Sequence, residues 1–158
     1  MSGPILFSAV SFRAIWAVTC LMLNGGAALA ADAPRAIVVT QAWVRASLGQ
    51  TPTTAAYLKI ENRGAAEDRV LSVATPAAAA AQLHESVSTD GIMRMQAVKS
   101  LGINPGQSLE LAPGGLHIMI MGLKSPLKAG QTIPIKLRLE RAGEIEVEAE
   151  VRGLGAAK

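Results

Sequence analysis

Short apolar runs recur along the chain from residue 36 onward, and turn-forming residues separate them. Within most runs apolar and polar residues alternate, which turns one face of a strand toward a core and the other toward water. No sustained helical period interrupts this pattern. It predicts about nine short strands, over residues 36–40 and, after a slight break, 42–46, then 54–61, 69–74, 82–88, 92–98, 107–111, 116–121, 132–140 and 144–151.

The last run shows the alternation most clearly. Every second position of residues 144–151 is acidic, which is typical of an antiparallel strand with one face in water. Asp90-Gly91, between two of the runs, is a strong signal for a tight hairpin turn. Pro76 and the five alanines after it read as a connection with a short helical turn. Many short strands at this spacing predict an all-β domain, either a β-sandwich or a Greek-key barrel.

The first 30 residues have the pattern of a secretory signal. Arg13 is their only charge, residues 14–23 are apolar, and Ala28-Leu29-Ala30 is a small-x-small cleavage pattern. The apolar segment is shorter than the roughly 20 residues that a membrane-spanning helix needs. We therefore expect residues 1–30 to be removed on export to a bacterial periplasm. Residues 31–158 then form a single domain without stable membrane insertion; the alternative is an uncleaved anchor.

Composition narrows the possible partners and chemistries. The chain has 15 basic and 12 acidic residues, a net charge of +3 and 3% aromatic residues. This even balance argues against nucleic acid as a partner, and the spread of basic residues indicates no membrane-surface patch. The single cysteine, Cys20, lies in the leader without the small residue that normally precedes a lipid-modified cysteine. A processed chain would hold no thiol, which excludes disulfides, Cys-ligated metals and cysteine nucleophiles.

One stretch, residues 82–123, collects the soft metal donors. It holds both histidines and four of the six methionines, and the other two methionines lie in the leader. Neutral imidazole and thioether groups suit Cu(I), or Ag(I), better than Mg, Ca or Mn. Core packing is the alternative for methionine, but packing does not explain why the other predicted strands contain none. The donors are His84, Met93, Met95, His117, Met119 and Met121.

Strand geometry can bring these donors together. Residues two apart in a strand point to the same face, so His117 and Met119 share a side. A tight hairpin brings the strands of His84 and Met95 next to each other. If the strand of His117 packs across from them, two imidazoles and two thioethers converge on one ion. The missing thiolate argues against a blue-copper electron-transfer centre.

The spacing of these four residues resembles the copper motif of the periplasmic PCuAC-type copper chaperone family. Ten residues separate His84 from Met95, twenty-one separate Met95 from His117, and one separates His117 from Met119. Further segments resemble the family along nearly all of the processed chain: Ala42-Trp43-Val44-Arg45, Ala55-Ala56-Tyr57, Asp68-Arg69-Val70-Leu71, and Pro113-Gly114-Gly115 through Met121-Gly122-Leu123.

The resemblance implies a cupredoxin-like β-barrel with Cu(I) held by His84, Met95, His117 and Met119. It also implies a periplasmic metallochaperone, not an enzyme, that delivers copper toward the CuA centre of cytochrome c oxidase. Its acceptor would be a protein such as subunit II of that oxidase or another copper chaperone. Two positions, Met93 and Met121, have no place in the motif. They either surround the ligands or belong to the core, and packing is the favoured interpretation.

Two other functions stay open from the residues alone. A copper-dependent redox or electron-transfer protein would use the same donors, although the missing cysteine counts against it. A metal-free β-sandwich interaction module would use the methionines only as core residues. Binding of Cu(I) would distinguish a copper chaperone or a copper redox protein from the metal-free module. A strong visible colour on adding Cu(II) would distinguish the redox protein from the chaperone.

Overall fold

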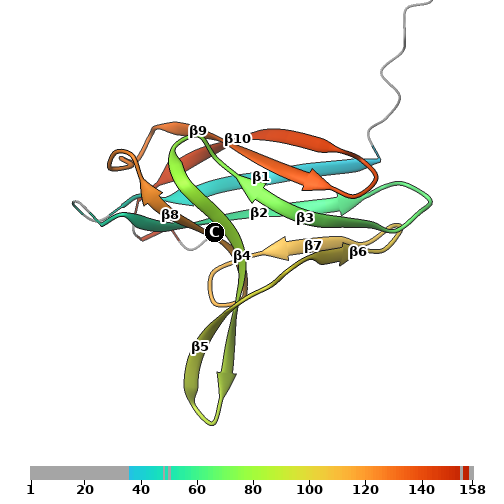
Figure 1. The fold of residues 1–158 in the computed structure, drawn as a ribbon, viewed down its shortest axis with the longest axis horizontal. Coiled ribbons are helices and arrows are strands. Elements are labelled where there is room, and N and C mark those ends of the chain that lie inside the picture. Colours follow the sequence, from blue (N-terminus) through green and yellow to red (C-terminus); the bar gives the residue numbers. More distant parts are fainter. Residues whose placement is uncertain (1–35, 48, 50, 154, 157–158) are drawn as a thin grey trace, which may run out of the picture. The chain divides into compact units, whose positions relative to one another are not determined.

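The computed structural model describes residues 36–47, 49, 51–153 and 155–156, and over these ranges the protein is all-β (Figure 1). The expected signal sequence and its cleavage site lie outside the described residues. Nothing in the described ranges forms a helix long and apolar enough to cross a membrane. The strands are β1 (Ile37–Arg45), β2 (Thr53–Asn62), β3 (Asp68–Ala74), β4 (Ala78–Thr89), β5 (Ile92–Ala97), β6 (Leu101–Ile103), β7 (Ser108–Leu111), β8 (Leu116–Leu123), β9 (Thr132–Leu139) and β10 (Glu144–Arg152).

These strands pair into one continuous sheet in the order β5-β4-β8-β2-β1-β10-β9-β3-β6, and β7 pairs with β2 beside that path. The pairing of β1 with β10 is parallel, whereas all the other pairings are antiparallel. Neighbours along this order are often distant in sequence, as in a Greek-key arrangement. As a result, β8 lies between β4 and β2, which places the second histidine strand beside the first.

The core lies on one face of the sheet and the candidate metal donors lie on the other. In β8, Ile118 and Ile120 are fully buried within the apolar core, together with Leu58 of β2 and Leu137 of β9. Successive side chains of a strand point to opposite faces. His117, Met119 and Met121 therefore point away from the core that Ile118 and Ile120 help to form.

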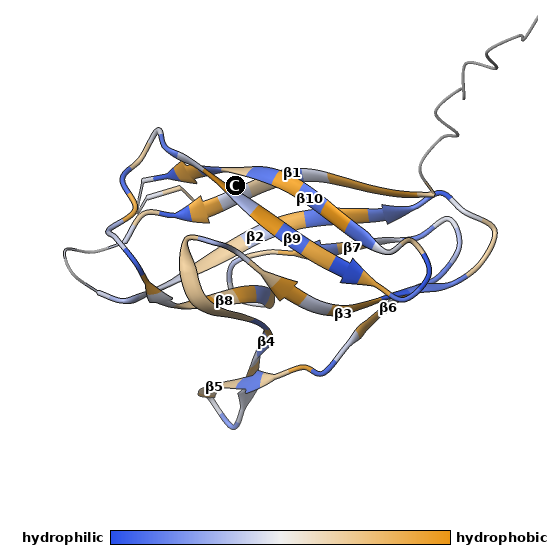
Figure 2. Cartoon of the chain, turned by 45° about the horizontal axis from the view of Figure 1, so that its top comes forward, coloured by the Kyte–Doolittle hydropathy of each residue, from blue (hydrophilic) through white to orange (hydrophobic). Residues whose placement is uncertain are grey.

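The last strand, β10, has one face in water, as its alternation of acidic and apolar residues predicts. Apolar and hydrophilic positions alternate along β9 and β10 in Figure 2, and every glutamate of β10 is exposed. Lys136 of β9 lies 3.1 Å from Glu144 and 3.2 Å from Glu146, which places opposite charges on the solvent face of this pair. The acidic and apolar alternation is thus that of a strand with one face in water.

The β4–β5 hairpin projects from the rest of the sheet (Figure 1). Thr89 pairs directly with Ile92, so only Asp90 and Gly91 form the turn. Both have positive φ angles, 53° for Asp90 and 75° for Gly91. Two successive positive φ angles are what a tight hairpin turn of this length requires, and Asp-Gly is the sequence that adopts them most readily. The predicted turn is confirmed.

Three details differ from the sequence prediction. The alanines after Pro76 do not form a helical turn, because β4 begins at Ala78 and pairs with β8 from Ala78 to Glu85. The two first runs form a single strand, β1, whose break is a bulge at Gln41, with a φ of 54°. The short strand β6 was not expected, and it brings the number of strands to ten rather than about nine.

The contact between β4 and β8 explains why the alanine segment extends. A Cβ atom on Gly122 would lie 2.8 Å from the Cβ atom of Ala79, so the two strands approach each other too closely for a larger residue at position 122. Small side chains on β4 permit this approach. Tertiary pairing therefore overrides the helical preference of a run of alanines.

Candidate metal site

The pairing of β4 with its two neighbours places all four expected ligands on one face of the sheet. His84 of β4 lies directly opposite His117 of β8. Met119 and Met95 lie opposite the β4 residues two positions before and two positions after His84, respectively. Because directly opposed residues share a face, and residues two apart in a strand share it as well, the four side chains emerge on the same side.

The two imidazole rings are close enough to share an ion. Their centroids lie 6.0 Å apart, with an angle of 46° between the ring planes. A metal bond to an imidazole nitrogen is about 2 Å long, so rings at this separation are close enough to bind one ion through one nitrogen each. The condition for convergence, that the strand of His117 packs beside that of His84, is met. Met95, however, lies diagonally from His84, whose direct partner in β5 is Ala97.

The environment of His117 frees one ring nitrogen for a metal. The side chain is 6% exposed, and its Nδ1 lies 2.9 Å from the carbonyl oxygen of Gly115. A carbonyl oxygen only accepts hydrogen bonds, so Nδ1 carries the proton and donates it. The lone pair of the neutral ring is then on Nε2. The turn at Pro113-Gly114-Gly115, where Gly114 has a φ of 84°, holds the Gly115 carbonyl in this position.

His84 has the complementary arrangement. Its Nε2 lies 3.3 Å from Oε1 of Gln82, another acceptor, so Nε2 carries the proton. Its Nδ1 is buried and has no hydrogen-bond partner. Burial, and to a lesser degree repulsion from His117, lower the pKa of His84 below its ordinary value of 6.5. The lowered pKa favours the neutral ring, which has an unpaired lone pair of the kind that a metal ion satisfies.

The two expected thioether ligands have different exposures. Met119 is partly buried and lines a shallow cavity with Arg45 and Thr54, whereas Met95 is 63% exposed on the projecting hairpin. The more buried part of the site therefore consists of His117 and Met119 on β8 with His84 on β4, and Met95 on β5 is the exposed part. Such a site opens toward the solvent on the β5 side.

The assignment of Met93 to packing is wrong. Its side chain is 60% exposed and lies outside the core. Met121 is partly buried on β8, opposite Ala80 of β4 and Thr53 of β2. By register both methionines share the face of the four expected ligands, each at two residues from one of them.

The face that holds the candidate ligands also holds an aromatic pair, which the pattern of metal donors in the sequence did not predict. Trp43 of β1 lies opposite Tyr57 of β2, with ring centroids 4.5 Å apart. The guanidinium carbon of Arg45 lies 5.9 Å from the Tyr57 ring centroid, and that of Arg152 lies 5.6 Å from the Trp43 ring centroid. The sequence drew attention to Trp43 and Tyr57 only through the family resemblance. Their pairing depends on the bulge at Gln41, which alternation alone does not predict.

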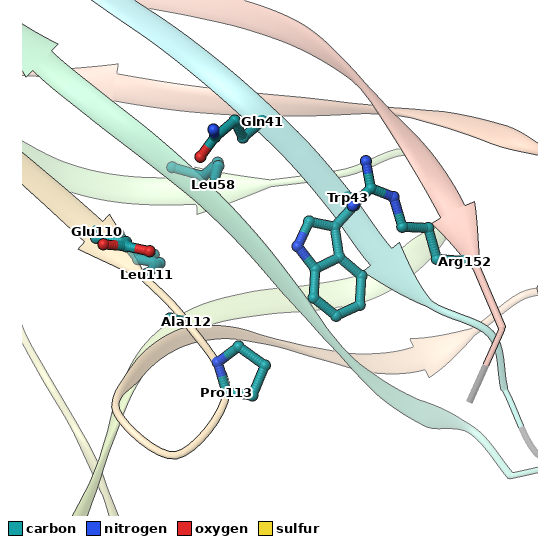
Figure 3. A pocket seen from close by; sticks show the side chains of 8 residues that line it. All are labelled: Gln41, Trp43, Leu58, Glu110, Leu111, Ala112, Pro113 and Arg152. Carbon is teal, nitrogen blue, oxygen red and sulfur yellow. The ribbon is translucent and has the colours of Figure 1, made fainter. Parts of the chain in front are cut away.

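Trp43 and Arg152 also line a pocket of about 480 Å³ (Figure 3). None of the four expected metal ligands contributes to its wall. The candidate metal donors therefore lie outside this pocket. In the part of the chain that the structure describes, no group of three or more His, Cys, Asp or Glu side chains gathers as a metal site. The donors on the β5-β4-β8 face are two imidazoles and nearby thioethers.

Comparison with known proteins gives matches over most of the described chain. The model of a family described as "Putative lipoprotein LpqE-like" matches residues 37–151. A protein of Leifsonia xyli subsp. xyli, named "Putative lipoprotein Lxx21020", is 40% identical over 122 residues, which cover 77% of this chain and 72% of that protein.

Solved structures of PCuAC proteins have a similar fold. The apo PCuAC domain of PmoF2 aligns with a TM-score of 0.65 at 22% identity, over 77% of this chain and 94% of that domain. The Cu(I) form of DR1885 from Deinococcus radiodurans is 29% identical and aligns with a TM-score of 0.58, over 81% of this chain and 85% of that one. The all-β, cupredoxin-like fold that the resemblance implied is confirmed.

Proposed function

This chain belongs to the LpqE-like family, which is the PCuAC family, and we propose that it is an exported metallochaperone that binds Cu(I). In this proposal His84, Met95, His117 and Met119 are the ligands. The protein carries the ion rather than catalysing a reaction. It acts in the periplasm and delivers copper toward the CuA centre of cytochrome c oxidase, through subunit II of that oxidase or another copper chaperone.

The observation that carries the proposal is the geometry of the two imidazoles. They are directly opposed across β4 and β8, with centroids 6.0 Å apart. The proton of His117 is engaged at Nδ1, and Nδ1 of His84 is buried without a partner. Each ring thus retains one free nitrogen, and thioethers from β5 and β8 share the same face. This donor set suits a soft, singly charged copper ion.

Two comparisons support the proposal. The DR1885 structure, at 29% identity, is described as a Cu(I) form. The Leifsonia protein is named as a lipoprotein, which agrees with export of this chain. The absence of a lipid anchor at Cys20 stays a prediction, because that residue lies outside the described part of the structure.

The mechanism follows from the ligand chemistry. Thioethers bind Cu(I) without losing a proton, and each histidine binds it through a neutral ring. Release of the ion therefore leaves four neutral groups and requires no change in oxidation state. An acceptor with thiolates can displace these ligands one at a time, because thiolates are strong ligands for Cu(I). Because Met95 is exposed, an acceptor thiolate can reach the ion from the side of this ligand.

The test is an anaerobic titration with Cu(I) against a chromophoric chelator, on the full chain with Cys20→Ser so that the leader supplies no thiol. We expect one tightly bound Cu(I). Met119→Leu and Met95→Leu should each weaken binding by about tenfold or more, equivalent to ~1.4 kcal/mol. Replacement of Met by Leu nearly conserves volume, so the free energy of unfolding should change by less than about 1.5 kcal/mol.

Met121→Leu is the matched control. It removes a thioether from the same strand and face as Met119, and copper affinity should stay within about twofold. Unchanged affinity in both ligand variants would refute the ligand assignment. No binding by the parent protein would refute the chaperone function and leave only the fold. A strong visible charge-transfer band with Cu(II) would favour the redox alternative instead.

A further inference from the structure

The outer strand of the β4–β5 hairpin exposes large apolar side chains. Met95 is 63% exposed, Met93 is 60% exposed and Ile92 is 57% exposed. A side chain that stays mostly in water gains little from the hydrophobic effect, so burial does not account for Met93. A thioether in this position keeps its sulfur accessible to a soft cation.

Met93 lies on the same face of the hairpin as the proposed copper ligands. It is opposite Ser88, and Met95 is opposite Ser86. These two serines follow His84 along β4 at steps of two residues, so all these positions share a face. Residues two apart in a strand are about 7 Å apart, and two long, flexible methionine side chains can span that distance around one ion.

On this face the side chains are buried or partly buried at the two histidines and mostly exposed on β5. His117 is 6% exposed, His84 is partly buried, and Met95 and Met93 are both more than half exposed. An ion that leaves the imidazoles in this direction meets Met95 first and Met93 next. The site therefore continues into a row of two thioethers that ends at Met93, one residue from the Thr89–Ile92 pair that closes the turn.

We propose that Met93 is a third, weaker thioether ligand, which accepts Cu(I) as it leaves the four-ligand site and presents it to the acceptor; this rests on the proposed function. A bond forms between Cu(I) and the Met93 sulfur while the bond to Met95 is kept. The bonds to the two histidines and to Met119 break. Copper stays Cu(I), so no electron is transferred. Acceptor thiolates then bind the ion as its two thioether bonds break.

Met121 provides the natural contrast. Like Met93, it lies two residues from a proposed ligand and shares the same face. Unlike Met93, it is partly buried between β4 and β2, on the side of the site away from the projecting hairpin. Position in the sheet, rather than the number of methionines, therefore distinguishes the proposed exit ligand.

The test uses Ag(I), a redox-stable soft cation, and protein with ¹³C-labelled methionine methyl groups, again with Cys20→Ser. Each methyl resonance is assigned by replacing that methionine with leucine. We expect the first equivalent of Ag(I) to shift Met95 and Met119. Further Ag(I) should shift Met93 with an affinity about 100-fold weaker, in keeping with fewer soft donors. The Met121 resonance should not follow this second phase.

Ile92→Met supplies the control for exposure alone. Position 92 is as exposed as position 93, but alternation places it on the opposite face of the hairpin. If the methionine introduced there responds to Ag(I) as Met93 does, Met93 is merely an exposed thioether and the proposal fails. It also fails if Met93 does not respond beyond one equivalent. A parent protein that binds no Ag(I) or Cu(I) at all would refute the proposed function as well.

A kinetic measurement completes the test. With Cu(I) bound, Met93→Leu should leave equilibrium affinity within about twofold and slow transfer to an excess of a dithiol by about fivefold or more. Met121→Leu should leave both quantities unchanged. Equal transfer rates in the parent protein and Met93→Leu, with tight binding intact, would overturn the role of Met93 while leaving the four-ligand site in place.

Discussion

Two regions of this protein that contain buried polar groups differ in how completely their hydrogen bonds are satisfied. At the ends of β2 and β3, the side chain of Asn62 donates to the carbonyl oxygens of Ala66 and Ile103 and accepts from the backbone nitrogen of Gly64. It is 1% exposed. Every polar atom of this side chain has a partner within the protein.

Asp68, at the start of β3, is satisfied in the same way. Its Oδ1 accepts from the backbone nitrogens of Arg69 and Arg141, and its Oδ2 accepts from that of Ala142. The carboxylate thereby fixes the turn between β9 and β10 against β3. On the β4–β8 face, by contrast, Nδ1 of His84 is buried and has no partner.

We interpret this difference as one between structural polar groups and the proposed metal ligands. An unsatisfied buried polar atom costs free energy, and a stable fold tolerates that cost where a ligand supplies the missing partner. The Asn62 and Asp68 region should therefore govern stability, and the His84 and His117 face should govern copper binding. Variants in one region should leave the property of the other unchanged.

Asn62→Ala should have the largest effect on stability. The change leaves two carbonyl oxygens and one backbone N–H without their partner in a buried region, and each loss costs about 1–3 kcal/mol before relaxation. We expect the free energy of unfolding in urea to fall by about 3 kcal/mol. Copper affinity of the folded variant should stay within about twofold. A copper defect larger than the stability defect would contradict the separation of the two regions.

Asp68→Asn should lower the free energy of unfolding by about 2 kcal/mol at pH 7, because an amide replaces one charged acceptor with a donor. Burial raises the pKa of Asp68, but hydrogen bonds from the backbone of Arg141, Arg69 and Ala142 outweigh it, and the net pKa lies below the ordinary 3.8. The stabilisation is therefore present above pH 3.8 and is lost as pH falls through the lowered pKa.

The difference in unfolding free energy between the parent protein and Asp68→Asn should accordingly narrow below pH 3.8. Urea unfolding at a series of acidic pH values measures it. A difference that stays constant through this range would show that the carboxylate charge does not contribute to the anchoring of the β9–β10 turn.

Much of the site followed from local sequence rules. Asp90-Gly91 sets the hairpin turn, and the spacing of His117 and Met119 sets their common face. Both rest on the geometry of one strand or one turn, which neighbouring residues determine. The direct opposition of His84 and His117 was predicted only conditionally, because it depends on which strand becomes the neighbour of β4.

What the sequence did not predict depends on contacts between distant segments. The alanines from Ala78 onward have no strand pattern of their own, and they extend because β8 pairs with them. The exposure of Met93 follows from the projection of the hairpin, which no alternation pattern specifies. The free nitrogen of each histidine is set by Gly115 and Gln82, whose positions appear only in the folded chain.

Gln82→Ala should affect copper binding but not stability, which tests the contrast between the two regions. It removes the only side-chain hydrogen bond that His84 makes within the described residues. Loss of a group that orients a metal ligand commonly weakens affinity by about 10–100-fold. Here the contact is 3.3 Å long and Gln82 is exposed, so we expect about fivefold weaker Cu(I) binding. Stability should hardly change. Gln82→Glu, which keeps an acceptor at this position, should restore most of the affinity.

The smallest expected effect is a pH dependence of the metal-free protein. Burial and the neighbouring His117 lower the pKa of His84 below 6.5, so between that lowered value and 6.5 the unfolded chain binds more protons than the folded one. Stability then rises with pH through this window, and it falls as the pH drops below 6.5. His84→Gln removes this contribution.

Urea unfolding of the parent protein and of His84→Gln, compared at pH 7.5 and pH 5, measures the contribution of His84. The parent protein should lose slightly more stability on acidification than the variant. The opposite sign would mean that the folded state favours the protonated ring, as it would if Nδ1 donated to an acceptor rather than keeping a free lone pair. His84 would then be a structural residue like Asn62 and could not bind Cu(I) without first giving up that bond.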